Sequence, residues 1–183
     1  MQGIRTDGRK RIAIESLFVL LTLVLIVVDQ WTKLYFSTSF NLGEKRIIIN
    51  DFFYFSYAIN RGAAWSFLSS ASWGQLFFKI LTPIALAGFI FFYIYSVKKN
   101  YKWLKVSLVF VISGTIGNFI DRLLIDGVVD FIGFIFGEYY FPVFNLADSF
   151  LTVGIIMLIV YFLFIDKNAV FKRNNAKKDN SSK

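Results

Sequence analysis

Residues 17–28 read LFVLLTLVLIVV and form the apolar centre of a longer segment, 12–36. Three further segments are similarly apolar, at 76–97, 103–125 and 146–165. Each is close to the roughly 20 residues that a helix needs to cross a bilayer. The sequence therefore predicts a mainly α-helical membrane protein with four transmembrane helices.

The composition supports a membrane location and excludes active sites that depend on cysteine or histidine. The chain has 183 residues, of which 56% are hydrophobic and 20% aromatic, and it contains neither cysteine nor histidine. Disulfides, thiolate nucleophiles, cysteine zinc sites and Ser-His-Asp triads are thereby excluded. We expect one integral-membrane domain over residues 1–183, with no metal and no cofactor.

The net charge of +8 is unevenly distributed. Lysine and arginine gather in the two tails, 1–11 and 167–183, and in the link between the second and third spans, 98–105. Basic residues favour the cytoplasmic side, so we predict both termini to be cytoplasmic and segments 37–74 and 126–145 to be extracytoplasmic. The charge then reflects topology and contact with anionic membrane lipids rather than nucleic-acid binding.

The two outer segments differ in composition. Residues 47–59 are mostly β-branched and aromatic, which predicts short strands lying at the membrane interface. Residues 131–144 contain Gly133, Gly137 and Pro142 among aromatic residues, and we interpret them as a loop or a short helix on the membrane surface.

Two acidic residues, Asp130 and Asp148, are the strongest candidates for chemistry. Each adjoins an apolar run, where a carboxylate is costly by about 2.5 kcal/mol or more at a helix centre. Asp148 alone could serve as a helix-dipole partner. Both acids, however, are expected at the same membrane depth. Two such carboxylates share a proton, so one can deprotonate water while the other polarises a peptide carbonyl.

Other polar residues have structural explanations that we weigh against function. Asp29 and Lys33 are four apart on one helix face, and we favour an ion pair with Lys33 extended toward the interface. Asn60 and Gly62 indicate a tight turn. Asn145 is placed to cap the fourth helix.

The third span carries a stripe of small and polar residues at helical spacing. Gly114 and Gly117 suit close helix packing, whereas Asn118, Asp121 and Arg122 make its outer part polar. We favour a structural network here, in which Arg122 could neutralise or position a nearby carboxylate.

The chain resembles the lipoprotein signal peptidases, also called signal peptidase II. The resemblance covers about Val28 to Gly154 and rests on five short motifs that occur in the family's order. They are Asp29-x-x-Thr32-Lys33, Asn60-x-Gly62-Ala63-Ala64-Trp65, Gly117-Asn118-x-x-Asp121-Arg122, Val129-Asp130-Phe131 and Phe144-Asn145-x-Ala147-Asp148.

The resemblance implies a bacterial inner-membrane aspartic endopeptidase with Asp130 and Asp148 as its catalytic dyad. It also implies a small extracytoplasmic β-sheet and a short surface helix or loop over the four transmembrane helices. It would cleave diacylglyceryl-modified prolipoproteins before the lipidated Cys, and cyclic lipopeptides such as globomycin would inhibit it. The residues that would bind substrate or brace the site are Asp29, Lys33, Asn60, Gly62, Ala64, Asn118, Asp121, Arg122, Asn145 and Ala147.

Three alternatives make different demands. A presenilin-like protease would need a Gly-x-Gly-Asp motif in a span, which the sequence lacks. A Ser-Lys signal peptidase would need a serine partner for Lys33 or Lys79, and none is evident. A small cation transporter could use Asp29, Asp121 and Asp148, and it predicts acids near the membrane midplane.

Overall fold

Long helices form the body of the protein, as the apolar segments predict. The computed structural model describes residues 2–62 and 73–165. Within them, four helices are long and apolar enough to cross a membrane. They are α1 (Gln2–Ser39), α2 (Gly74–Lys99), α3 (Lys102–Ile125) and α4 (Leu146–Val160), which continues as a π-helical turn over Tyr161–Ile165.

Helix α3 lies at the centre of the bundle and packs against α1, α2 and α4. In its apolar window 56% of the residues are buried, against 6%, 6% and 11% in those of α1, α2 and α4. Small residues allow the close approach of α3 and α4: a Cβ on Gly154 would lie 2.8 Å from the Val111 nitrogen. Gly114 likewise faces the main chain of α4 at Ala147. The predicted packing role of the small stripe on α3 is confirmed at Gly114.

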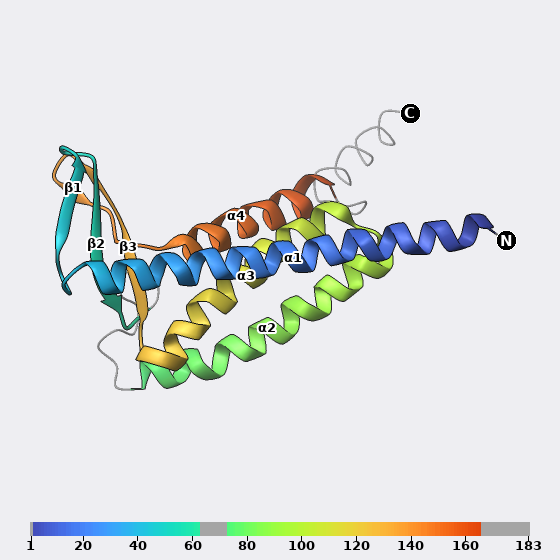
Figure 1. Cartoon of the computed structure of the whole chain (residues 1–183), viewed down its shortest axis with the longest axis horizontal. Helices are drawn as coiled ribbons and strands as arrows, with labels where there is room; N and C mark the ends of the chain where they lie inside the picture. Colours follow the sequence, from blue (N-terminus) through green and yellow to red (C-terminus); the bar gives the residue numbers. More distant parts are fainter. Residues whose placement is uncertain (1, 63–72, 166–183) are drawn as a thin grey trace, which may run out of the picture.

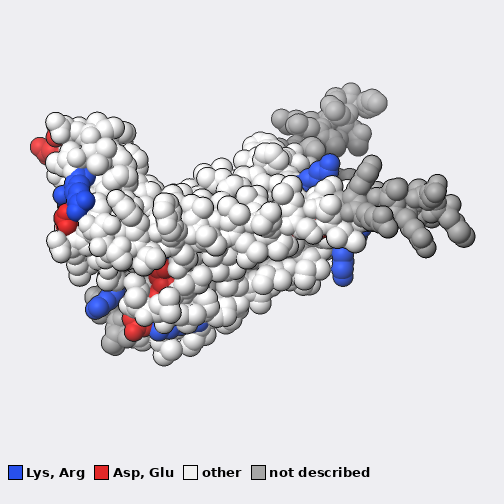
Figure 2. All heavy atoms as spheres, in the orientation of Figure 1, with Lys and Arg blue, Asp and Glu red and all other residues white. Residues whose placement is uncertain are grey.

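The outer surface of the bundle is apolar between two charged ends. Figure 2 shows lysine and arginine side chains near both ends of this face and acidic side chains at the sheet end, with mostly uncharged surface between them. Large apolar side chains such as Leu20, Phe91 and Ile156 are more than 45% exposed, at 55%, 66% and 55%. Lipid chains are the solvent that makes such exposure favourable.

A small antiparallel sheet caps one end of the bundle. It has the order β1 (Lys45–Ile49), β2 (Phe53–Asn60), β3 (Val128–Phe136) and β4 (Tyr139–Tyr140). Figure 1 shows it at the end opposite the start of α1 and the end of α4. The strands expected in residues 47–59 are therefore confirmed.

The second outer segment differs from the expectation of a loop or short helix, because residues 131–144 supply most of β3 and all of β4. Gly133 and Gly137, which favoured an irregular segment, are instead accommodated in the β3–β4 hairpin. Gly133 lies directly under the ring of Tyr54, where a Cβ would collide with it. Gly137 has φ +64° and makes the β3–β4 turn, a conformation that side chains disfavour.

An aromatic cluster joins the sheet to the bundle. Phe36 and Phe40 of α1 are buried against Val129 and Phe131 of β3. The rings of Phe36 and Phe131 are stacked, with centroids 4.3 Å apart and planes inclined by 12°. This contact fixes the residues on both sides of Asp130 against α1.

Candidate active site

Asp130 lies on β3 directly opposite Ala58 of β2, and its side chain is only 3% exposed. Its two carboxylate oxygens accept hydrogen bonds from different segments. The Asn145 Nδ2 donates to Oδ1 at 2.7 Å, and the Asn60 Nδ2 donates to Oδ2 at 3.1 Å. Strand pairing sets the position of the carboxylate, and the two amides set its orientation.

Asp148 lies in the first turn of α4 and takes part in a capping box. The Asn145 side chain accepts from the Asp148 nitrogen at 2.9 Å, and Asp148 Oδ2 accepts from the Asn145 nitrogen at 3.3 Å. The predicted capping role of Asn145 is thus confirmed. In addition, the Asn118 Nδ2 of α3 donates to Asp148 Oδ1 at 2.7 Å, so the carboxylate is also held from the bundle.

Asn145 connects the two carboxylates. Its side-chain amide donates to Asp130, while its main-chain nitrogen donates to Asp148. Burial raises the pKa of Asp130 to about 7, with the nearby charge of Asp148 as the second cause and hydrogen bonds from Asn60 and Asn145 opposing them. The pair can therefore hold one proton near neutral pH, which is the state that acid–base work on a water molecule requires.

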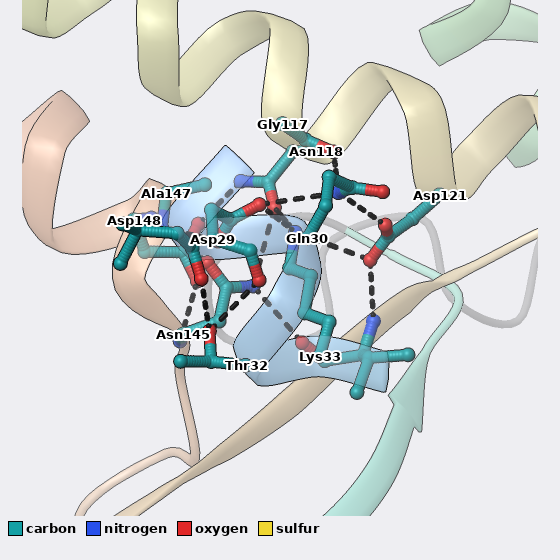
Figure 3. Close-up of polar contacts among 12 residues, drawn as sticks. Asp29, Gln30, Thr32, Lys33, Gly117, Asn118, Asp121, Asn145, Ala147 and Asp148 are labelled. Carbon is teal, nitrogen blue, oxygen red and sulfur yellow. Dashed lines mark hydrogen bonds and ion pairs between the residues drawn. The ribbon is translucent and has the colours of Figure 1, made fainter. Parts of the chain in front are cut away.

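A second polar cluster lies beside Asp130 and Asp148. Lys33 Nζ is 2.9 Å from Asp29 Oδ2, 3.1 Å from Asp121 Oδ2 and 3.0 Å from Asn118 Oδ1. The predicted i,i+4 ion pair is confirmed, but the expected extension of Lys33 toward the interface is wrong. Lys33 is 3% exposed, because α3 offers two further acceptors inside the bundle. Figure 3 shows Asp29 and Lys33 among these polar contacts.

The cluster contacts the main chain next to Asp130 and next to Asp148. Asp29 Oδ1 accepts from the nitrogen of Ala147 at 2.8 Å, one residue before Asp148. Asp121 Oδ2 accepts from the nitrogen of Val129 at 2.9 Å, one residue before Asp130. The structural role favoured for Asp29 and Asp121 is thereby supported by their contacts with α4 and β3.

The turn after β2 and Arg122 complete the described site. Asn60 Oδ1 accepts from the nitrogen of Gly62 at 2.9 Å, which makes the predicted tight turn. Arg122 donates to the carbonyl oxygens of Asn118 and Gly62, and it lies over the ring of Phe78. Within residues 2–62 and 73–165 it makes no ion pair with a carboxylate, and its Nε has no partner. Ala64 lies outside the described residues.

Gln30 is a site residue that the sequence reasoning missed. Its Nε2 lies 3.2 Å from Asp29 Oδ2, 3.1 Å from the Gly117 oxygen and 3.0 Å from Asp121 Oδ1. The available signal was a polar side chain inside an apolar span, next to Asp29, where any polar residue is a functional candidate.

The geometry also bears on the alternatives. Lys33 contacts two acids and an amide, and Lys79 pairs with Asp126 at 2.5 Å, so in the described part of the chain neither lysine has a serine partner. Asp148 begins α4 and Asp121 lies in the last turns of α3, at the sheet end of the bundle. This location disfavours a transporter with acids near the midplane. Among the residues with assigned positions, no group of three or more acids is arranged as metal ligands.

Comparison with known proteins gives one consistent family. Residues 21–164 match the family model described as Signal peptidase (SPase) II. A curated protein of Listeria welshimeri named lipoprotein signal peptidase is 40% identical over 149 residues, covering 81% of this chain and 94% of that protein. A Bacillus pumilus protein of the same name is 39% identical over 150 residues, covering 82% and 94%.

Solved structures agree with this match. Two chains described as bacterial membrane enzymes are each 34% identical to this chain. The first superposes with a TM-score of 0.72 over 84% of this chain and 91% of its own length. The second has a TM-score of 0.70 over 82% and 95%.

Proposed function

The chain belongs to the signal peptidase II family, and on that premise we propose that it cleaves lipoprotein precursors with Asp130 and Asp148 as an aspartic dyad. The enzyme is a protease that removes signal peptides from prolipoproteins. The observation that carries the aspartic mechanism is the bridge made by Asn145, which donates to one carboxylate through its side chain and to the other through its main chain.

The proposed chemistry needs one proton shared by the dyad. The ionised carboxylate removes a proton from water, and the resulting hydroxide attacks the peptide carbonyl carbon. The protonated carboxyl donates to the carbonyl oxygen as negative charge develops there. Collapse of the tetrahedral intermediate transfers a proton to the leaving nitrogen and separates the two peptides. The pKa of Asp130 near 7 supports a singly protonated dyad at neutral pH.

The substrate is proposed to carry a diacylglyceryl group on the Cys that follows the scissile bond. A dyad at the outer end of the helices reaches only peptide bonds held at that depth, and buried methylenes anchor a lipid by about 0.8 kcal/mol each. Phe52, Tyr139, Tyr140 and Phe141 are 44%, 54%, 56% and 37% exposed beside β1 and β4. These aromatic side chains are suited to cover a lipidated segment, and a cyclic lipopeptide such as globomycin would compete for the same surface.

We further propose the bacterial cytoplasmic membrane as the location, with both termini cytoplasmic and the sheet outside. The lysine and arginine residues of both tails and of the α2–α3 link support this orientation. A prolipoprotein then presents its cleavage site on the side of the membrane where the dyad lies.

Substitution of each dyad residue tests the mechanism. Asp130→Asn and Asp148→Asn should each abolish cleavage of a diacylglyceryl-modified prolipoprotein by purified enzyme, and the double variant should be no worse than either single variant. Asp126→Asn is the matched control, because Asp126 is an exposed outer acid four residues before Asp130. Substantial turnover by either single dyad variant would refute the assignment.

The lipid requirement is tested separately. The same polypeptide with an unmodified Cys should be cleaved little or not at all, while chelators should leave cleavage of the lipidated form unchanged. Comparable rates on the two polypeptides would show that the lipid is not recognised, even with the dyad correctly assigned.

A further inference from the structure

Gln30 of α1 makes a set of hydrogen bonds that Lys33, Asp130 and Asp148 do not make. Its two amide protons are shared among three acceptors, Asp29 Oδ2, the carbonyl oxygen of Gly117 and Asp121 Oδ1, at 3.0–3.2 Å. Helices α1 and α3 approach closely here, and glycine at position 117 permits this, since a Cβ there would lie only 2.5 Å from Asp29 Oδ2. Gln30 therefore links the acid of its own helix to the acid of α3, as Figure 3 shows.

The two acids that Gln30 links each hold one half of the proposed dyad. Asp29 accepts from the main-chain nitrogen before Asp148, and Asp121 accepts from the main-chain nitrogen before Asp130. A continuous set of hydrogen bonds thus runs from the start of α4, through α1 and α3, to the start of β3. Any change in the separation of Asp29 and Asp121 is passed to the two carboxylates of the dyad.

Lys33 also bridges these acids, but it does not duplicate the contact made by Gln30. Lys33 reaches Oδ2 of Asp121, the same oxygen that accepts from Val129. Within the described residues the partner of Asp121 Oδ1 is Gln30. With Lys33 alone, the carboxylate plane of Asp121 is free to rotate about its last bond, and the hydrogen bond to Val129 loses its fixed direction.

We propose that Gln30 is a positioning residue that sets the separation and relative orientation of Asp130 and Asp148. It touches neither carboxylate of the dyad and acts through Asp29 and Asp121. The inference rests on the proposed function of Asp130 and Asp148, and it assigns a role to a position that the first motif, Asp29-x-x-Thr32-Lys33, leaves unspecified.

Gln30→Met tests the proposal, because methionine keeps the length of the side chain and removes the donor. We expect kcat on a diacylglyceryl-modified prolipoprotein to fall by about 10- to 100-fold, since displacement of reacting groups by about 1 Å costs about 100-fold. KM should stay within about two-fold, because Gln30 is not part of the substrate surface.

The pH profile of kcat distinguishes positioning from a purely structural role. Coupled carboxylates titrate with two separated apparent pKa values, and weaker coupling brings these values together. The charged groups around the dyad remain in the variant: Asp29 and Lys33 on α1, and Asp121 and Arg122 on α3. Loss of the Gln30 link should therefore narrow the bell-shaped profile, whereas a smaller folded fraction would lower it at every pH without changing its shape.

Thr22→Val is the matched control on the same helix. It removes a side-chain hydrogen bond, from Thr22 Oγ1 to the Phe18 oxygen at 3.0 Å, away from the dyad. We expect it to leave kcat and the pH profile unchanged. An unchanged kcat for Gln30→Met, or a lowered kcat with a profile of unchanged width, would overturn the proposal. Cleavage by Asp130→Asn or Asp148→Asn would instead overturn the dyad assignment, so the two failures are distinguishable.

Discussion

Replacing Asp130 with asparagine should stabilise the protein at pH 8 while it abolishes cleavage. The Asp130 carboxyl is 3% exposed, and burial together with the charge of Asp148 raises its pKa from 3.8 to about 7. Between these two values the folded protein holds a proton that the unfolded chain releases. Stability therefore falls as pH rises through this window, and the full cost is present above about pH 7.

The magnitude follows from the size of that difference. Each pKa unit corresponds to about 1.4 kcal/mol, so the raised pKa of Asp130 lowers the free energy of unfolding by roughly 4 kcal/mol at pH 8 and by roughly 1–2 kcal/mol at pH 5. Asparagine removes this cost, but it replaces one carboxylate oxygen with an NH2 group. Both oxygens of Asp130 accept hydrogen bonds from the NH2 groups of Asn60 and Asn145, so one of these donors loses its acceptor. An unsatisfied donor costs about 1–3 kcal/mol. The net gain in the free energy of unfolding is thus about 1–3 kcal/mol at pH 8, whereas at pH 5 the net effect lies between a gain of about 1 kcal/mol and a loss of about 2 kcal/mol.

Thermal unfolding of the detergent-solubilised protein at both pH values measures this gain. Each kcal/mol corresponds to about 2–4 °C in Tm for a chain of this size. Asp51→Asn is the control, because Asp51 is an exposed acid in the β1–β2 turn with φ 56°, a conformation that asparagine tolerates. A difference in Tm between Asp130→Asn and wild type that is the same at pH 5 and pH 8 would refute the reasoning.

Three further predictions concern the bundle and its orientation. Lys33→Met should lower the free energy of unfolding by about 3–5 kcal/mol, because it leaves buried carboxylates without their cation, and an unchanged Tm would contradict this. Gly154→Ala should cost about 1–3 kcal/mol, since its Cβ would lie 2.8–2.9 Å from main-chain atoms of α3, whereas Gly88→Ala, with nothing within 4 Å, should not be destabilising. In this chain without cysteine, Ile48→Cys should react with an impermeant maleimide from outside the cell and Lys99→Cys only after permeabilisation; labelling of both in intact cells would reverse the orientation.

Features that depend on neighbouring residues could be predicted from the sequence. The four helices follow from the length of the apolar runs, and their ends fall within a few residues of the expected ones apart from the longer start of α1. The Asp29–Lys33 pair follows from its spacing of four, and the cap made by Asn145 follows from its place before an apolar run. Local periodicity and local hydrogen bonding determine all of these.

Features that depend on distant segments could not be predicted. Residues 131–144 form strands because β2 offers a pairing edge from a segment about 80 positions earlier, which composition alone does not reveal. The Lys33 side chain points into the bundle because Asn118 and Asp121 of α3 provide acceptors there. Without these acceptors, its ammonium group would be more favourably placed at the membrane interface. The role of Gln30 could not be predicted for the same reason, because two of its three acceptors lie on α3, 87 and 91 positions away in the sequence.

The proposed dyad is assembled from a strand outside the bundle and a helix within it, so neither element alone fixes the distance between the carboxylates. Helix α1 contributes neither aspartate, yet it contacts both halves of the site. Phe36 stacks on Phe131 beside Asp130, and Asp29 holds the main chain beside Asp148. If Asp130 and Asp148 carry the reaction, as we propose, side chains at the sheet end of the inner face of α1 set its geometry. The lipid-facing side chains of α1, such as Leu23 and Val27, then affect only its fit to the bilayer. Conservative substitutions at the sheet end of the inner face of α1 should therefore lower kcat, whereas those on its lipid-facing side should leave kcat unchanged.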